Sequence, residues 1–288
     1  GLAMFAGVAE MVARAMVGFF FVPLWGYFAA CIASPVAWFF ACFFLIPAYI
    51  VYGIGVLSKP QMLVFTPVLL VGIVDHVFLK DFSRKKFFIN LLSGLCVIGG
   101  LVLFSVPFGL SKVIAQYTST LGSYEFATVN GFNFWALVGK NGVDQNAAFL
   151  FLPARVWGTI AILLIVLFTF IIARRCRDVP YKYYLLSAFI ILTMFTFSVR
   201  MHERYIFPGI ILLLFLLIYQ PIKHMWICYS GFAVLTYYNI GWILRNYGDF
   251  TYYNDKPLIR LVAAGIVGFL IYFYYIIEKY CLCKAVQK

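Results

Sequence analysis

The chain contains 288 residues, of which 65% are hydrophobic and only 11% are charged, and it carries a net charge of +12. So few polar side chains cannot cover the surface of a water-soluble globule of this size, which excludes a soluble enzyme. The Lys and Arg residues stand in short clusters between apolar runs, without a basic face or a recognition motif, and they therefore predict membrane topology and no nucleic-acid partner.

Apolar runs recur along the whole chain, each close to the roughly 20 residues that a transmembrane helix needs. They predict an all-α protein, a polytopic transmembrane helical bundle of about nine or ten spans that forms a single domain over residues 1–288. The expected spans are 2–24, 26–42, 37–57, 61–79, 88–108, 151–173, 183–199, 205–220, 225–244 and 258–277. The second and third overlap at a turn near Ser34-Pro35.

The beginning of the chain carries the weakest of these signals. Glu10 and Arg14 lie one helical turn apart in the first run, a pair that is also typical of a helix in the membrane interface. The chain starts with Gly1 and shows no signal peptide, so we expect part of the N-terminus to be missing.

Basic clusters predict the orientation of the spans, because short loops that are rich in Lys and Arg stay in the cytoplasm. With the expected spans, the clusters at 80–86, 174–182, 223 and 279–288 all fall on one side, so we expect a cytoplasmic C-terminus. The other side receives residues 58–61, 200–205, 245–256 and a loop of about 109–150. That loop is longer than most connections, and such loops are commonly functional or carry short helices.

The densest polar cluster beside an apolar run is the segment 200–208. Helical spacing would place Arg200, Glu203 and Arg204 on one face, with a carboxylate between two guanidinium groups suited to binding phosphate. Pro208 fits a first helical position, so the next span is expected to begin there. An interfacial ion-pair cluster that only ends a helix is the alternative explanation.

Two weaker motifs lie in the other expected outer segments. In Lys59-Pro60-Gln61, the proline could separate two helices while Lys59 extends to the interface, and this structural explanation is sufficient for the residues alone. The segment 130–135 places Asn130 and Asn133 among aromatic residues that include Trp135. Such a mixture could bind sugar hydroxyls and stack on a sugar ring, although an interfacial re-entrant segment explains it equally well.

Established catalytic and metal motifs are missing from the sequence. It has no Gly-rich phosphate loop, no zinc-binding His-Glu-x-x-His and no Gly-x-Ser-x-Gly elbow, and its seven cysteines lack metal-ligand spacing. We therefore assign no cofactor and no metal ligand from the sequence, while a divalent metal remains compatible with it.

The segment from Met201 to Pro208 resembles the Met-His-Glu-Arg-Tyr-x-x-Pro element of bacterial integral-membrane mannosyltransferases. These enzymes are related to the one that adds the second mannose of GPI anchors, and they belong to the GT-C glycosyltransferases. Lys59-Pro60-Gln61 is similar to the family's Lys-Pro-Gln element, and residues 130–137 resemble its Asn-x-Phe-Asn-x-Trp-Ala-Leu element. The three elements occur in the family's order and cover roughly residues 25–220.

The resemblance implies a GT-C-like fold and a glycosyltransferase that moves a hexose, expected to be mannose, from a polyprenyl-phosphate carrier to an extracytoplasmic lipid or glycan acceptor. The protein would then be a multi-pass protein of the bacterial plasma membrane, or of the endoplasmic reticulum membrane in a eukaryote. The implied substrate-binding residues are Lys59, Gln61, Asn130, Asn133, Trp135, Arg200, His202, Glu203, Arg204 and Tyr205, with His202 and Glu203 as the catalytic candidates.

One family element differs in this chain. The family carries Trp-Gly-Gln-x-Asp before Lys-Pro-Gln, whereas Trp25-Gly26 is followed here by Tyr27-Phe28-Ala29. We expect the catalytic carboxylate upstream of Gly1 and the given chain to be inactive by itself. Nearby guanidinium charge should keep Glu203 ionised, so we expect it to hold Arg200 and Arg204 in place and not to act as the base.

Two other functional classes share some of these features. A transporter or flippase of lipid-linked sugars would also have many spans, but transporters usually bind substrate near the midplane on broken helices, often within internal repeats. This sequence gathers its polar residues at one face and shows no repeat, which favours the enzyme. A polymerase of surface polysaccharide would need the same outer-face chemistry and remains an alternative.

Overall fold

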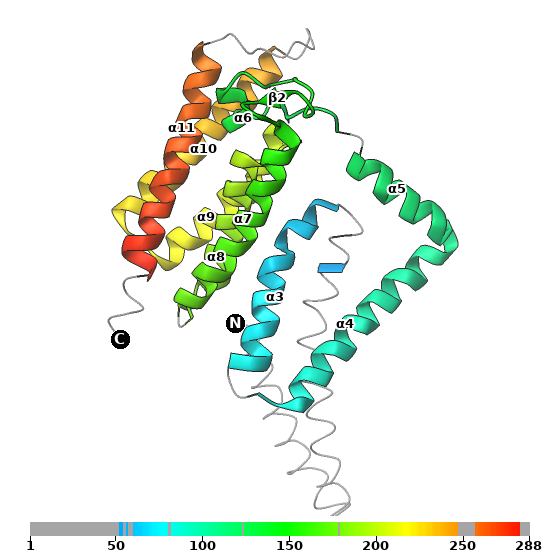
Figure 1. Ribbon diagram of the computed structural model, residues 1–288. Coiled ribbons are helices and arrows are strands. Elements are labelled where there is room, and N and C mark those ends of the chain that lie inside the picture. The colour runs from blue at the N-terminus through cyan, green and yellow to red at the C-terminus, as the bar shows by residue number, and fades with distance from the viewer. Residues whose placement is uncertain are drawn as a thin grey trace, which may run out of the picture. The chain divides into compact units, whose positions relative to one another are not determined.

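The computed structural model describes residues 52, 53, 56, 60–79, 82–122, 124–177, 179–246 and 257–282. The expected spans 2–24 and 26–42 and most of 37–57 lie outside these residues, as does Lys59. Within them the chain is mostly helical, and its four strands contain two residues each. The prediction of a helical protein is therefore confirmed for the part that the structure describes (Figure 1).

The helices follow the apolar runs of the sequence closely. In chain order the elements are η2 (Pro60–Phe65), α3 (Thr66–Val74), η3 (Asp75–Leu79), α4 (Arg84–Ser105), η4 (Val106–Phe108), α5 (Leu110–Gly122), β1 (Thr128–Val129), α6 (Phe134–Leu137), β2 (Ala148–Phe149), β3 (Leu152–Pro153), α7 (Ala154–Arg175), α8 (Lys182–Phe197), β4 (Met201–His202), η5 (Glu203–Ile206), α9 (Phe207–Tyr219), α10 (Lys223–Arg245), α11 (Pro257–Ile276) and η7 (Ile277–Leu282). Every expected span from 61–79 onward thus corresponds to helix, and the expected loop 109–150 begins with α5.

Four helices among the described residues are long and apolar enough to cross a membrane: Arg84–Phe108, Ala154–Arg175, Lys223–Arg245 and Pro257–Tyr280. Two shorter apolar helices cover Met62–Phe78 and Lys182–Phe197. Helices of this length without charged interiors match the thickness of a bilayer's hydrocarbon core, so they indicate a membrane protein.

The described residues belong to two compact units. One contains η3, α4, η4 and most of α5. Its ring contacts include Phe78 with Phe82 at 5.7 Å and Phe78 with Phe87 at 6.4 Å. The second contains Val64–Gly72 and the elements from β1 onward, and it carries the segments 130–137 and 200–208.

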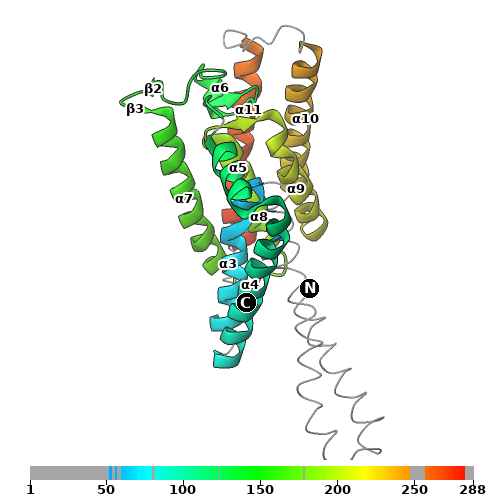
Figure 2. The same cartoon turned by 90° about the vertical axis from the view of Figure 1, so that its right-hand side faces the viewer.

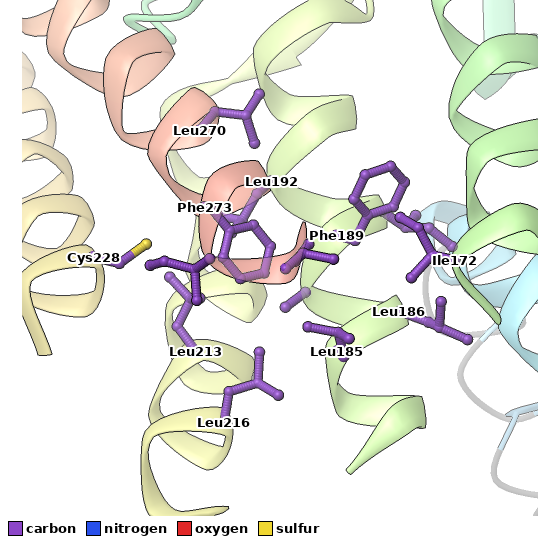
Figure 3. Close-up of a cluster of buried hydrophobic side chains, with 14 of the residues drawn as sticks. Ile172, Leu185, Leu186, Phe189, Leu192, Leu213, Leu216, Cys228, Leu270 and Phe273 are labelled. Atoms are coloured by element: carbon purple, nitrogen blue, oxygen red, sulfur yellow. The ribbon is translucent and has the colours of Figure 1, made fainter. Parts of the chain in front are cut away.

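Helix α8 forms the centre of the second unit. It is apolar on all sides, which predicts a buried helix, and it packs between α7 and α9 while α10 packs against α9 and α11. Leu185, Leu186 and Leu192 of α8 are completely buried in the resulting core (Figure 3). Gly209 of α9 permits this packing, because a Cβ atom there would lie 2.8 Å from Leu192 Cδ2.

The two ends of the second unit differ in character. At one end, the loop with β2 and α6 lies beside the start of α11 and the end of α10 (Figures 1 and 2). At the other end, Arg175 lies 3.8 Å from Glu278, and His224 Nδ1 lies 2.6 Å from the Tyr272 hydroxyl. This arrangement agrees with the expected grouping of the basic segments 174–182, 223 and 279, and with the expected position of the segments 130–137 and 200–208 at the opposite end.

Candidate functional site

The segments 130–137 and 200–208, which are far apart in sequence, meet at the loop end of the second unit. Strand β1 pairs in parallel with β4, so that Thr128 lies opposite Met201 and Val129 lies opposite His202. The Thr128 hydroxyl lies 3.0 Å from the carbonyl oxygen of Met201, and an isolated bridge joins Asn130 to His202. The backbone therefore fixes these two segments directly against each other.

This pairing corrects the expectation that Arg200, Glu203 and Arg204 share one helical face. Helix α8 ends at Phe197, residues Met201–His202 form a strand, and only Glu203–Ile206 form a short 3₁₀ helix. The Arg200 amide donates to the carbonyl of Ala127 at 2.8 Å, so it takes part in a long-range contact and not in a helix. The expected start of the following helix is confirmed, because Pro208 lies in the first turn of α9.

Arg200 is held by a residue that the sequence did not indicate. Its Nε donates to Gln145 Oε1 at 2.9 Å, and Gln145 is only 6% exposed. Gln145 Nε2 in turn donates to the carbonyl of Tyr124 at 2.9 Å. Arg200 has a φ of 65°, a left-handed conformation that costs a residue with a side chain about 1–3 kcal/mol and persists only where the surroundings impose it.

Glu203 and Arg204 form an open ion pair. Arg204 Nη1 lies 3.6 Å from Glu203 Oε1, and the two side chains are 56% and 18% exposed, respectively. The Arg204 guanidinium also lies 5.7 Å from the centre of the Tyr205 ring. A pair this wide and exposed contributes little stability, so the Arg204 guanidinium is positioned but still accessible to an anion. The expected pairing of Glu203 with Arg204 is thus present.

His202 lies between two tyrosine rings. The ring centroid of Tyr124 is 5.1 Å away and that of Tyr205 is 5.2 Å away, both in edge-to-face geometry. Burial, and to a smaller extent the charge of Arg204, together lower the pKa of His202 to about 4. Its Nε2 is buried and has no hydrogen-bond partner among the residues that the structure describes. A neutral imidazole with one unused nitrogen can accept or donate a single hydrogen bond to a ligand hydroxyl.

Asn133 and Trp135 hold the loop against the end of α8. The Asn133 carboxamide oxygen caps α6 by accepting from the amides of Trp135 and Ala136, at 3.0 and 3.3 Å. Its Nδ2 donates to the Phe195 carbonyl at 2.9 Å, and Trp135 Nε1 donates to the Phe197 carbonyl at 3.0 Å. Asn133 is completely buried and Trp135 is 1% exposed, so the polar groups that the sequence suggested for sugar binding serve the fold.

Asn130 belongs to a chain of three amides. Its backbone amide donates to Asn141 Oδ1 at 2.7 Å, and Asn141 Nδ2 donates to Asn130 Oδ1 at 3.1 Å. Its carbonyl accepts from Asn239 Nδ2 at 2.9 Å, and Asn239 Oδ1 accepts from the Phe132 amide at 3.0 Å. Asn239 could have been found from the sequence, because a buried amide within an apolar helix usually has a specific partner.

The two expected residues of the Lys-Pro-Gln motif do not belong to the second unit as the structure describes it. Lys59 lies outside the described residues, and Gln61 lies in η2. Within the described ranges, no three His, Cys, Asp or Glu side chains come together in a group that could hold a metal ion. Comparisons with protein-family models, curated proteins and solved structures find no match for the chain.

Proposed function

We propose that this protein is a multi-pass membrane glycosyltransferase of the GT-C type. It would transfer a hexose, mannose in the first instance, from a polyprenyl-phosphate carrier to an extracytoplasmic lipid or glycan acceptor. The observation that carries this proposal is the direct pairing of Thr128–Val129 with Met201–His202. It unites the two segments whose residues resemble separate elements of one mannosyltransferase family, although they are far apart in the chain.

Arg204 is the group best suited to bind the donor phosphate. Its guanidinium is accessible, is anchored beside Glu203 and Tyr205, and presents the planar set of donors that matches phosphate oxygens. Arg200 adds a second guanidinium, oriented by Gln145, in the same segment. Positive charge fixed at this position would stabilise the phosphate that leaves when the sugar is transferred.

His202 and Glu203 have different proposed roles. Glu203 pairs with Arg204 and positions it, whereas His202, being neutral, offers its buried nitrogen to a hydroxyl of the sugar or acceptor. We assign neither residue as the base that deprotonates the acceptor. Lys59 and Gln61 remain expected substrate-binding residues.

The proposed orientation places the C-terminus and the segments 80–87 and 174–182 in the cytoplasm, and the loop 109–150 outside it. The basic segments along the chain support it, because such segments are retained in the cytoplasm. The site then lies on the extracytoplasmic side. A transporter of lipid-linked sugars is the competing class, and the gathering of polar groups at one end of the second unit favours the enzyme.

The experiment measures transfer from a radiolabelled polyprenyl-phosphate mannose in membranes that contain the full-length protein. Replacing Arg204 with Gln should lower kcat/KM by about 10- to 100-fold, because a charged hydrogen bond to phosphate is lost. Arg204→Lys should restore only part of the activity. Arg155→Gln is the matched control, since this exposed arginine lies at the start of α7 and contacts Gln145 through its backbone amide. Unchanged transfer by Arg204→Gln would contradict the proposal.

A further inference from the structure

A cavity of about 780 Å³ lies between α7, α8 and α11, entirely within the second unit. Its walls are apolar along one face of α7, which includes Ala161, Leu164, Phe168 and Ile172. On the opposite wall, Phe189 of α8 lies across from Ile172 (Figure 3). The volume falls within the range of roughly 300–1,000 Å³ that is usual for ligand sites.

The cavity has the length and surface of a site for a hydrocarbon chain. Its lining on α7 runs from Trp157 to Arg175, a distance of about 27 Å along a helix, close to the thickness of a bilayer core. The Thr193 and Tyr274 hydroxyls, which also line it, lie 2.8 Å apart and satisfy each other. These two residues therefore leave no unpaired hydroxyl facing a hydrocarbon chain in the cavity.

The two ends of the cavity differ in chemistry: one is lined by aromatic rings, and the other carries charged side chains that could bind a lipid headgroup. At the loop end it is bounded by aromatic rings, including Trp135 and Phe149 at 5.5 Å from each other, and none of Arg200, His202, Glu203 and Arg204 lines it. At the other end Arg175 and Glu278 both line it. Their charged groups are 3.8 Å apart and their side chains are 59% and 69% exposed, so a ligand can reach both.

We infer that this cavity binds an acyl chain of a zwitterionic aminophospholipid, with the lipid phosphate at Arg175 and its ammonium group at Glu278. An arginine matches a phosphodiester, and a carboxylate 3.8 Å from it supplies the partner for a nearby amine. A purely anionic headgroup would meet the negative charge of Glu278, and a hydrocarbon without a headgroup would leave Arg175 unused. The site is separate from the one at Arg204, so the inference does not depend on the proposed function.

The test uses the full chain purified from nanodiscs that contain equal amounts of phosphatidylethanolamine and phosphatidylglycerol, with retained lipid counted by native mass spectrometry. The wild type should retain phosphatidylethanolamine preferentially. Ala161→Trp, which fills the cavity, should remove it. The matched control is Leu163→Trp, because Leu163 is on the same helix, is 65% exposed and does not line the cavity.

Headgroup variants keep the test decisive if Ala161→Trp fails to fold. Arg175→Gln and Glu278→Gln should each lower retention of phosphatidylethanolamine about tenfold, the effect of one charged hydrogen bond, whereas Arg177→Gln should not change it. Equal retention of both lipids would overturn the headgroup assignment. A second experiment pairs a cysteine at position 161 with a cysteine introduced within residues 1–51 and tests for a disulfide in the membrane. Formation of this disulfide would overturn the inference, because a segment of the chain itself would then occupy the cavity.

Discussion

Arg200 and Gln145 are joined by a hydrogen bond of 2.9 Å between Nε and Oε1, which crosses 55 residues of sequence and ends on a buried amide. The same Gln145 side chain donates to the Tyr124 carbonyl. One glutamine thus contacts both the backbone at Tyr124 and the side chain of an arginine in the candidate site.

Replacing Gln145 with Ala should lower the free energy of unfolding by about 1–3 kcal/mol, because the buried partners of the amide lose their hydrogen bonds. It should also raise the KM for the lipid donor more than it lowers kcat, since Arg200 would bind phosphate in a less fixed orientation. Thermal unfolding and donor-dependent kinetics measure the two effects. Asn146→Ala is the control, because its exposed side chain contacts Asp144. Equal behaviour of the two variants would show that Gln145 has no such role.

The pH dependence of stability should report His202. Its pKa in the folded protein is about 4, below the ordinary value of 6.5, so between these values the unfolded chain binds more protons than the folded one. His202 should therefore cost no stability above pH 6.5, and stability should fall as the pH drops from 6.5 to 4. His202→Gln should weaken this dependence, as measured by unfolding midpoints from pH 4 to 8. Identical slopes for variant and wild type would rule the assignment out.

Asn239→Leu should destabilise the protein by about 2–4 kcal/mol, because it leaves the Phe132 amide and the Asn130 carbonyl buried without their partner. Tyr237→Leu introduces the same residue at a position of the same helix that is 80% exposed, and should have little effect. Chemical unfolding in detergent compares them. If both variants are equally stable, the amide chain does not anchor the loop.

Gly231 should not tolerate a methyl group. A Cβ atom there would overlap the Phe269 ring of α11, so Gly231→Ala should force the two helices apart and cost about 1–3 kcal/mol. Gly241 lies on the same helix, and a Cβ atom there would meet no described atom within 4 Å. Gly241→Ala should therefore stabilise the helix slightly, by about 0.5–1 kcal/mol. Opposite signs for the two substitutions are the expected result, and destabilisation by both would contradict it.

Single cysteines can test the proposed topology in intact cells, in a variant whose seven native cysteines are replaced by serine. A membrane-impermeant reagent should label a cysteine at Ser119, in the loop 109–150, but not one at Lys85, in a basic cluster. Both positions should react once the membrane is permeabilised. The reverse pattern in intact cells would invert the orientation and place the candidate site in the cytoplasm.

Local features of the sequence predicted the helices well. Each apolar run from residue 61 onward forms helix, because a continuous stretch of apolar residues needs only its own backbone hydrogen bonds to be stable in lipid. Pro208 marked the start of α9 for an equally local reason, since a first helical position does not need the amide that proline lacks. The grouping of Arg175 and Lys279 at one end of the second unit follows from counting the helices between them.

The sequence by itself determined the helical, membrane-type architecture and the general location of the polar segments, because these depend on composition and on spacing along the chain. Only the tertiary structure decided how the candidate site is built. Arg200 lies in a bend with a φ of 65° and not in a helix, because the residues that follow it, Met201–His202, pair with Thr128–Val129, 73 residues away. Asn133 and Trp135 hold the loop, and Gln145 orients Arg200, because the hydrogen-bond partners of buried polar groups come from distant segments that no local pattern identifies.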